Sequence, residues 1–218
     1  MGLLGGKVVL CLGDSITAGA LSSSSSNSYV GKLKELSGAN VIGYGSGGSR
    51  IARQSVPSAN PVLDRDFILR ADEMQDYADY VLVFGGTNDF GHGDAPLGKM
   101  GDDTPYTFYG ALNCLYTKLR NKYPMARLVA ITPLHREFEL VKCEKGNVVV
   151  PLCDYVQAIK QVANAFSIPV LDLYSIAEML PDIPENKAEF FAQDGLHPND
   201  AGHLRLAKTM YDFLLNQL

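Results

Sequence analysis

The 218-residue sequence has no tryptophan, only four cysteines and no long hydrophobic run. A transmembrane helix needs about 20 consecutive apolar residues, and no segment approaches that length, so we expect no membrane span. Four widely spaced cysteines without a C-x-x-C pair are too few for a disulfide scaffold. The absence of tryptophan removes the strongest aromatic platform for stacking a sugar ring, although eleven tyrosines remain.

Neither sign of charge dominates the sequence. The sequence carries 19 Lys and Arg against 24 Asp and Glu, which gives a net charge of −5. No basic run exceeds two residues, which argues against a nucleic-acid partner. No cluster of His, Cys and Asp has the spacing of a metal site, so we expect no metal. Lys7 interrupts the apolar start of the chain, so we expect a cytoplasmic protein unless a leader peptide has been removed.

Short apolar segments that suit β-strands alternate with segments of helical periodicity. Runs of Val, Ile and Leu without polar alternation are typical of parallel strands that helices cover on both faces. Such strands are expected at Lys7–Leu12, Asn40–Tyr44, Tyr80–Phe84, Leu128–Ile131 and Pro169–Leu173. Helices are expected at Tyr29–Leu36, entered from Asn27 or Ser28, at Thr107–Tyr123, at Cys153–Phe166, and from the N-cap Asn199 onward.

This alternation predicts a doubly wound α/β fold of about five parallel strands in three layers, with residues 1–218 forming a single domain. Residues Phe138–Val150 break the pattern, because two β-type pieces flank the turn-forming sequence Glu144-Lys-Gly-Asn147. We interpret this segment as an inserted β-hairpin. Its edge strand could support a homodimer.

Small and polar residues follow the predicted strands. In an open parallel sheet, ligands bind beyond the carboxyl ends of the strands. Three such ends are followed by GDSIT (13–17), GSGGSR (45–50) and GGTND (85–89), and the last helix is preceded by DGLHPN (194–199). We therefore expect these four loops to meet at one edge of the sheet.

In this order the four loops resemble the motif blocks of the SGNH (GDSL) hydrolases, and they span residues 13 to 198, nearly the whole chain. The resemblance implies a flavodoxin-like fold and a serine esterase or acylhydrolase that needs no cofactor. It assigns the oxyanion hole to the backbone N–H groups of Ser15 and Gly48 and to the side-chain amide of Asn88. One departure is Gly43, which stands where many members of the family carry Asn.

The chemistry of the residues agrees with this resemblance. A serine hydroxyl is a poor nucleophile until a neighbouring base removes its proton, and Ser15 lies on a turn that can expose its hydroxyl. His197 is the best candidate base, because an ordinary imidazole accepts and returns a proton near neutrality. Asp194, three residues earlier, can reach the other ring nitrogen and fix its tautomer. We expect these three residues to form a catalytic triad.

Four further residues are candidate substrate contacts: Asp14, Arg50, His92 and His135. Asp14, like Asp89, also suits the bracing of a loop through backbone N–H groups. Arg50 could meet an anionic or hydroxyl-rich substrate or lie on the surface. His92 belongs to the loop of residues 90–104, which could form a wall of the acyl or leaving-group pocket. For His135, we mainly expect a structural role.

Two other functions stay open at this point. Gly43, Gly45 and Gly48 match the spacing G-x-G-x-x-G, so a nicotinamide-dinucleotide-binding oxidoreductase is one alternative, although that fingerprint belongs after the first strand. A catalytically silent binding module of the same fold is the other. For the esterase, the range of the family favours a small-molecule ester with a short acyl group, such as an acetylated sugar.

Overall fold

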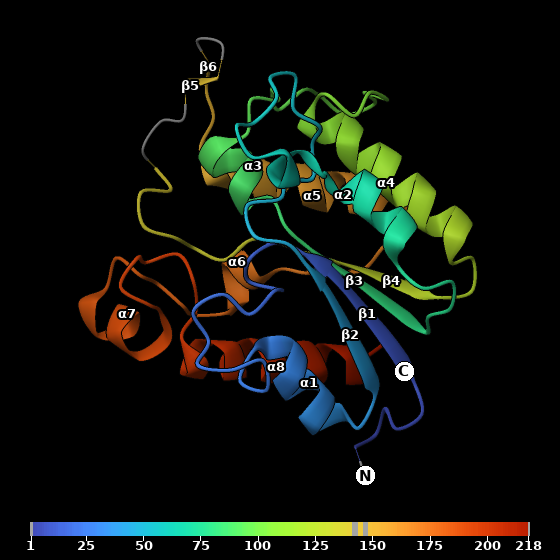
Figure 1. Cartoon of the computed structure of the whole chain (residues 1–218), viewed down its shortest axis with the longest axis vertical. Coiled ribbons are helices and arrows are strands. Elements are labelled where there is room, and N and C mark those ends of the chain that lie inside the picture. Colours follow the sequence, from blue (N-terminus) through green and yellow to red (C-terminus); the bar gives the residue numbers. More distant parts are fainter. Residues whose placement is uncertain (1, 141–143, 146–147, 218) are drawn as a thin grey trace.

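The computed structural model describes residues 2–217, except 141–143 and 146–147, and places a parallel sheet at the centre of the protein (Figure 1). Its five strands lie in the order β2-β1-β3-β4-β7, and every pair is parallel. This order is the flavodoxin-like one, so the predicted fold class is confirmed. The strands are β1 (Val8–Gly13), β2 (Asn40–Gly45), β3 (Tyr80–Phe84), β4 (Arg127–Ile131) and β7 (Val170–Leu171).

Helices cover both faces of the sheet (Figure 1). One face packs on α1 (Tyr29–Ser37) and α8 (Asp200–Leu215), and the other on α2 (Phe67–Arg70), α4 (Phe108–Lys122) and α5 (Leu152–Ala165). Along β1, Leu10 and Leu12 face the second group, whereas Val9 and Cys11 face the first. Burial on both faces explains why this strand has a continuous apolar sequence.

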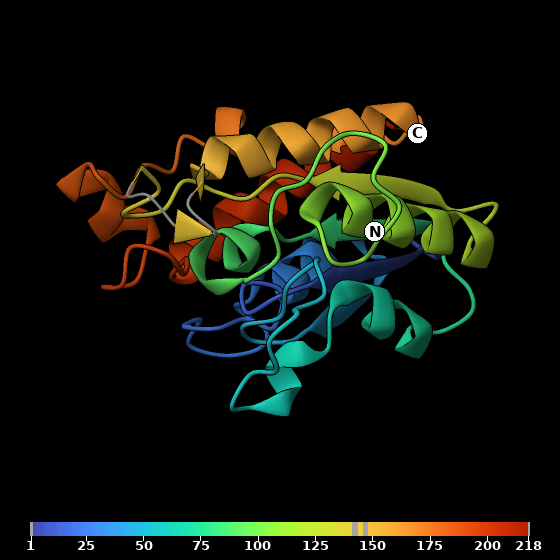
Figure 2. The same ribbon diagram turned by 90° about the horizontal axis from the view of Figure 1, so that it is seen from above.

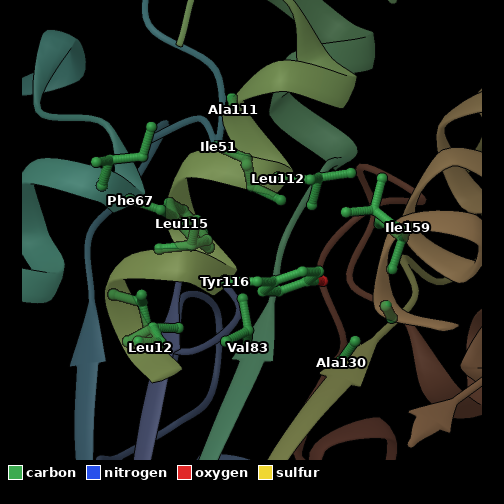
Figure 3. Close-up of a cluster of buried hydrophobic side chains, with 14 of the residues drawn as sticks. Leu12, Ile51, Phe67, Val83, Ala111, Leu112, Leu115, Tyr116, Ala130 and Ile159 are labelled. Atoms are coloured by element: carbon green, nitrogen blue, oxygen red, sulfur yellow. The ribbon is translucent and has the colours of Figure 1, made fainter. Parts of the chain in front are cut away.

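Large aliphatic and aromatic side chains fill the layer between the sheet and α4 and α5 (Figure 3). Leu115 and Tyr116 of α4 are almost completely buried against this face of the sheet. Burying one such leucine contributes about 1.5–3 kcal/mol. This layer fixes the strands, and the carboxyl ends of the strands carry the loops of the candidate site.

Side chains cap three of the four helices that the sequence predicts, α1, α4 and α8, whereas α5 begins after Pro151 without a side-chain cap. Ser28, rather than Asn27, accepts a hydrogen bond from the Gly31 N–H at the start of α1. Asn199 accepts from the Gly202 N–H at the start of α8, as predicted. A capping side chain of this kind contributes about 1 kcal/mol, because it satisfies an N–H that has no partner within the helix.

Several short helices had no periodic signal in the sequence. They are α3 (Thr87–His92), α6 (Leu173–Ile176) and α7 (Pro184–Phe190), together with the 3₁₀ turns η1 (Pro61–Asp64) and η2 (Ala71–Glu73). The segment expected to be a loop from residue 90 therefore begins inside α3. Helices of four to seven residues cannot show a repeating apolar face, which explains why they were missed.

The predicted strand Pro169–Leu173 is wrong at both ends, since β7 has only two residues. The chain turns at Asp172, whose carboxylate accepts hydrogen bonds from Thr132 Oγ1 and Ser175 Oγ at 3.0 and 2.9 Å. Leu173 consequently opens α6 instead of extending the sheet.

The expected insertion contains β5 (Glu144–Lys145) and β6 (Val148–Val149), which pair antiparallel apart from the central sheet. The expected turn at residues 146–147 lies outside the described residues. The pair projects from the top of the molecule in Figure 1, whereas α7 lies at the left of its lower half, and both lie on the left side of Figure 2. No helix in the described ranges is both long and apolar enough to cross a membrane.

Candidate active site

Ser15 lies on a tight turn directly beyond the carboxyl end of β1. The backbone carbonyls of Asp14 and Ser15 accept hydrogen bonds from the N–H groups of Ala18 and Ala20, at 3.0 and 2.9 Å. The buried carboxylate of Asp14 accepts from the Ile16 N–H at 3.0 Å. These bonds hold the turn from both sides and leave the Ser15 hydroxyl to bond elsewhere.

The loop before α8 brings its carboxylate and imidazole together. Asp194 Oδ1 accepts the backbone N–H groups of Leu196 and His197, at 3.1 and 3.0 Å. Gly195 has a φ of +59°, and a Cβ there would lie 2.5 Å from Glu137 Cδ. Because a left-handed conformation and a close neighbour both disfavour a side chain, glycine suits this position.

The three predicted triad residues form one hydrogen-bonded series. Asp194 Oδ2 lies 2.6 Å from His197 Nδ1, and His197 Nε2 lies 2.8 Å from Ser15 Oγ. An ionised carboxylate can only accept, so Nδ1 carries the hydrogen and Nε2 is left to accept from the Ser15 hydroxyl. An imidazole in this tautomer can take the serine proton directly.

The surroundings of Asp194 favour its ionised form. Burial alone would raise the pKa of the carboxyl, but hydrogen bonds from the His197 ring and from two backbone N–H groups outweigh burial and lower it. The side chain is 41% exposed, so water shares in the solvation of the charge. Asp194 is therefore available as a charged partner for an imidazolium at His197.

Two of the residues expected to stabilise an oxyanion, Gly48 and Asn88, lie on the loop after β2 and at the start of α3. Gly48 has a left-handed φ of +71°. The next carbonyl, that of Ser49, accepts from Asn88 Nδ2 at 3.0 Å, and Asn88 is only 6% exposed. Asp89 braces the same loop, as predicted, because its carboxylate accepts the N–H groups of Ile51 and Ala52 at 2.9 and 2.8 Å.

Arg50 is only 4% exposed, so a surface role for it is wrong. Its Nη2 donates to the Leu63 carbonyl at 2.9 Å and lies 3.2 Å from Asp64 Oδ1. Its Nη1 lies 3.3 Å from Nδ1 of His92, whose Nε2 lies 3.2 Å from Asn88 Oδ1. Arg50 and His92 are thus connected to the Asn88 amide, and a direct contact of either with substrate stays a prediction.

His135 belongs to a second imidazole–carboxylate pair near the first. Its Nδ1 lies 2.8 Å from Glu139 Oε1, and its ring packs on Tyr174 with ring centroids 3.8 Å apart. The hydrogen bond to Glu139 raises the pKa of His135. Together with Asp14 and Leu196, His135 borders a small gap that is too tight to admit a water molecule. These contacts suit the structural role expected of His135, and both that role and a contact with substrate stay predictions.

One residue that positions these loops was not predicted. Arg70 is buried and donates to the Gly13 carbonyl at 2.8 Å, to Ser49 Oγ at 2.7 Å and to the Tyr44 carbonyl. It therefore links the ends of β1 and β2 to the loop after β2, and burial lowers its pKa to about 10. The only signal in the sequence was an arginine at the end of the apolar run Phe-Ile-Leu-Arg.

The environment of Asp14 differs from that of Asp194. Burial raises the pKa of the Asp14 carboxyl to about 6, although the Ile16 N–H and the nearby His197 oppose this effect. The carboxyl titrates close to neutral pH as a result, beside the turn that carries Ser15. Asp14 is observed here as a loop brace, and a contact with substrate stays a prediction.

The glycine-rich turn does not support the dinucleotide-binding alternative. Gly43 and Gly45 are the last part of β2, an edge strand of the sheet. The dinucleotide fingerprint needs a helix that starts at its last glycine and points its N-terminus at the pyrophosphate. Residues 49–60 are described in full and contain no helix. Among the described residues, no group of three or more His, Cys, Asp or Glu could hold a metal ion.

A serine hydroxyl, an imidazole and a carboxylate in series at the carboxyl edge of a parallel sheet are typical of hydrolases with a serine nucleophile. The sequence profile of the GDSL-like lipase/acylhydrolase family matches residues 11–205. The chain belongs to this family and is a carboxylic ester hydrolase.

Solved structures share the fold of this chain over nearly its whole length. A protein from Lactobacillus plantarum is 32% identical, with a TM-score of 0.82 over 97% of this chain and 98% of its own. An acetyl xylan esterase is 22% identical, with a TM-score of 0.66 over 95% and 99% of the two chains. A variant of an acetyl-xylooligosaccharide esterase from Geobacillus is 21% identical, with a TM-score of 0.60 over 97% and 95%. Among proteins with curated functions, none matches this chain by sequence.

Proposed function

We propose that this protein is a serine esterase that cleaves its substrate through an acyl-enzyme on Ser15. The observation that carries the proposal is the hydrogen-bonded series from Asp194 through His197 to Ser15, with steps of 2.6 and 2.8 Å. These are distances at which protons move between heavy atoms without rearrangement. Membership of an ester-hydrolase family supports the same reaction.

The reaction begins with attack of Ser15 Oγ on the carbonyl carbon of the ester while His197 Nε2 takes the hydroxyl proton. The resulting oxyanion accepts hydrogen bonds from the N–H groups of Ser15 and Gly48 and from the Asn88 amide. His197 then gives its proton to the leaving alkoxide, the C–O bond of the ester breaks, and the acyl group stays on Ser15. Asp194 stabilises the imidazolium that exists between these two steps.

Deacylation repeats the cycle with water as the nucleophile. His197 Nε2 removes a proton from water, and the hydroxide attacks the acyl carbon of the Ser15 ester. The second tetrahedral intermediate collapses when His197 returns the proton to Ser15 Oγ. A carboxylic acid leaves, and the enzyme regains its starting protonation state.

A short acyl group, such as acetyl on a sugar, is the substrate that we propose. The gap beside the Ser15 turn, lined in part by Ile16, Phe84 and Leu196, is too tight to admit a water molecule and so offers no channel for a long acyl chain. Two proteins of similar fold act on acetylated xylan or xylo-oligosaccharides, as stated by their names. A cytoplasmic location and a homodimer stay predictions, as does the single domain over residues 1–218.

Replacing Ser15 by alanine tests the nucleophile. We expect kcat for p-nitrophenyl acetate to fall by about 10⁴-fold or more, because the covalent route is lost. Ser26→Ala makes the same chemical change at an exposed loop serine and should leave kcat unchanged. A fluorophosphonate probe should label the natural protein once, at Ser15. Undiminished turnover in Ser15→Ala contradicts the proposal. If the natural protein neither reacts with the probe nor hydrolyses esters, it is a catalytically silent binding module.

A series of p-nitrophenyl esters from acetate to decanoate, measured beside acetylated xylose, tests the substrate class. We expect kcat/KM to be highest for acetyl and to decrease as the acyl chain lengthens. A maximum at eight or more carbons contradicts the short-acyl proposal and leaves the assignment of Ser15 intact.

A further inference from the structure

The side-chain amide of Asn88 is held at both of its ends. Its Nδ2 donates to the Ser49 carbonyl at 3.0 Å, and its Oδ1 lies 3.2 Å from Nε2 of His92, one turn further along α3. His92 Nδ1 in turn lies 3.3 Å from Nη1 of Arg50. The three side chains therefore form a continuous hydrogen-bonded line that ends on the loop after β2.

Chemistry fixes the direction of every bond in this line. The Ser49 carbonyl can only accept, so the nitrogen of the Asn88 amide must face it and the oxygen must face His92. The amide oxygen also only accepts, so His92 Nε2 carries the hydrogen and Nδ1 is left as an acceptor. Arg50 can only donate, and its Nη1 supplies the hydrogen that Nδ1 needs. All of these hydrogen bonds can form together when His92 is neutral and carries its hydrogen on Nε2.

Arg50 provides a fixed end to the line. Its Nη2 donates to the Leu63 carbonyl at 2.9 Å, to Ser58 Oγ at 3.0 Å and to Asp64 Oδ1 at 3.2 Å. Four hydrogen bonds on a side chain that is only 5% exposed leave the guanidinium little freedom. A rigid donor at Nδ1 keeps the imidazole ring of His92 in one orientation, although His92 itself is exposed.

We infer that His92 is a positioning residue that orients and polarises the Asn88 amide, with Arg50 fixing the ring of His92. The inference rests on the proposed role of Asn88 in the oxyanion hole. A hydrogen bond received by the amide oxygen draws electron density from the amide nitrogen and makes its remaining N–H a stronger donor. An amide that is already oriented also needs no reorganisation when the oxyanion forms.

Replacing His92 by phenylalanine removes both ring nitrogens and keeps an aromatic side chain. Since one complete oxyanion donor contributes about 10²–10³-fold, we expect partial loss of its alignment to lower kcat for p-nitrophenyl acetate about tenfold. KM should stay the same, because the ground-state ester carries no oxyanion. His92→Gln should recover part of kcat, because its amide N–H can donate to Asn88 Oδ1. A rise in KM at constant kcat instead assigns His92 a substrate contact and overturns the inference.

A double-mutant cycle with Asn88→Ala separates positioning from a general structural effect. If His92 acts only through Asn88, His92→Phe should change kcat by less than about twofold once Asn88 is alanine. An equal loss in both backgrounds overturns the inference, as does equal activity of the Phe and Gln variants. Thermal unfolding of each variant shows whether the fold is retained.

The cycle also distinguishes this inference from the proposed function. If kcat is unchanged in Asn88→Ala, Asn88 is not an oxyanion donor, and the positioning inference falls while the proposed esterase reaction on Ser15 stands. If kcat falls strongly in Asn88→Ala but is unchanged in His92→Phe, the positioning role of His92 alone is overturned. The reaction of Ser15 with a fluorophosphonate probe reports on the nucleophile independently of either outcome.

Discussion

Replacing Asp194 by asparagine tests the charge of the proposed triad without removing the shape of its loop. The asparagine oxygen can still accept the N–H groups of Leu196 and His197, which Asp194 Oδ1 accepts at 3.1 and 3.0 Å. The asparagine nitrogen then faces His197 Nδ1 as a donor. It stabilises the tautomer with hydrogen on Nε2, and this tautomer cannot accept the proton of Ser15.

The size of the effect follows from the exposure of the carboxylate. In a buried triad, this substitution lowers kcat by about 10⁴-fold. The Asp194 side chain is 41% exposed, so water screens its charge and solvates part of the imidazolium in the variant. We therefore expect kcat to decrease about 10²–10³-fold, which corresponds to roughly 3–4 kcal/mol of transition-state stabilisation.

Steady-state hydrolysis of p-nitrophenyl acetate measures this loss directly. Asp212→Asn, on an exposed position of α8, is the matched control and should retain full kcat. If Asp194→Asn folds normally and keeps kcat within about threefold of the natural protein, the carboxylate does not act on the base in the way proposed.

Two further predictions concern stability. Burial lowers the pKa of His203, so the unfolded chain binds a proton below about pH 6.5 before the folded protein does. As the pH falls from 7 to 5, the free energy of unfolding should therefore decrease less in His203→Gln than in the natural protein. Urea titrations that give both proteins the same pH dependence of this free energy contradict the prediction. Arg70→Met should lose about 2–4 kcal/mol, because it removes the buried guanidinium that donates to the Gly13 and Tyr44 carbonyls and to Ser49 Oγ. A loss below about 0.5 kcal/mol on urea unfolding shows that these carbonyls find other partners.

The sequence was sufficient for the parts of the fold that depend on repeated local patterns. Tyr80–Phe84 is a strand with the predicted bounds, because a central strand buried on both faces needs an uninterrupted apolar sequence. Asn199 was identifiable as an N-cap, since capping depends on residues within one turn. The meeting of Ser15 and His197, 182 positions apart, was expected from topology and the family resemblance.

What could not be predicted depends on contacts between distant segments. Arg50 has the sequence context of a surface residue, and only the fold brings Asp64, Leu63 and His92 around it. Helix α3 also depends on a distant segment, because the carboxylate of Asp89 accepts hydrogen bonds from the loop after β2 rather than from its own helix. Such elements owe their stability to tertiary hydrogen bonds, for which a short sequence window carries no signal.

The two halves of the candidate site differ in what supports them. Ser15 follows a central strand of the sheet. The loop of His197, in contrast, is hydrogen-bonded to the segment that leads into the insertion after β4. Glu137 of that segment donates its N–H to the Gly195 carbonyl at 2.9 Å, and its carboxylate pairs with Lys187 of α7 at 2.8 Å. A change in the length or conformation of the insertion would therefore reach the base through Glu137, while the nucleophile would keep the framework that the sheet provides.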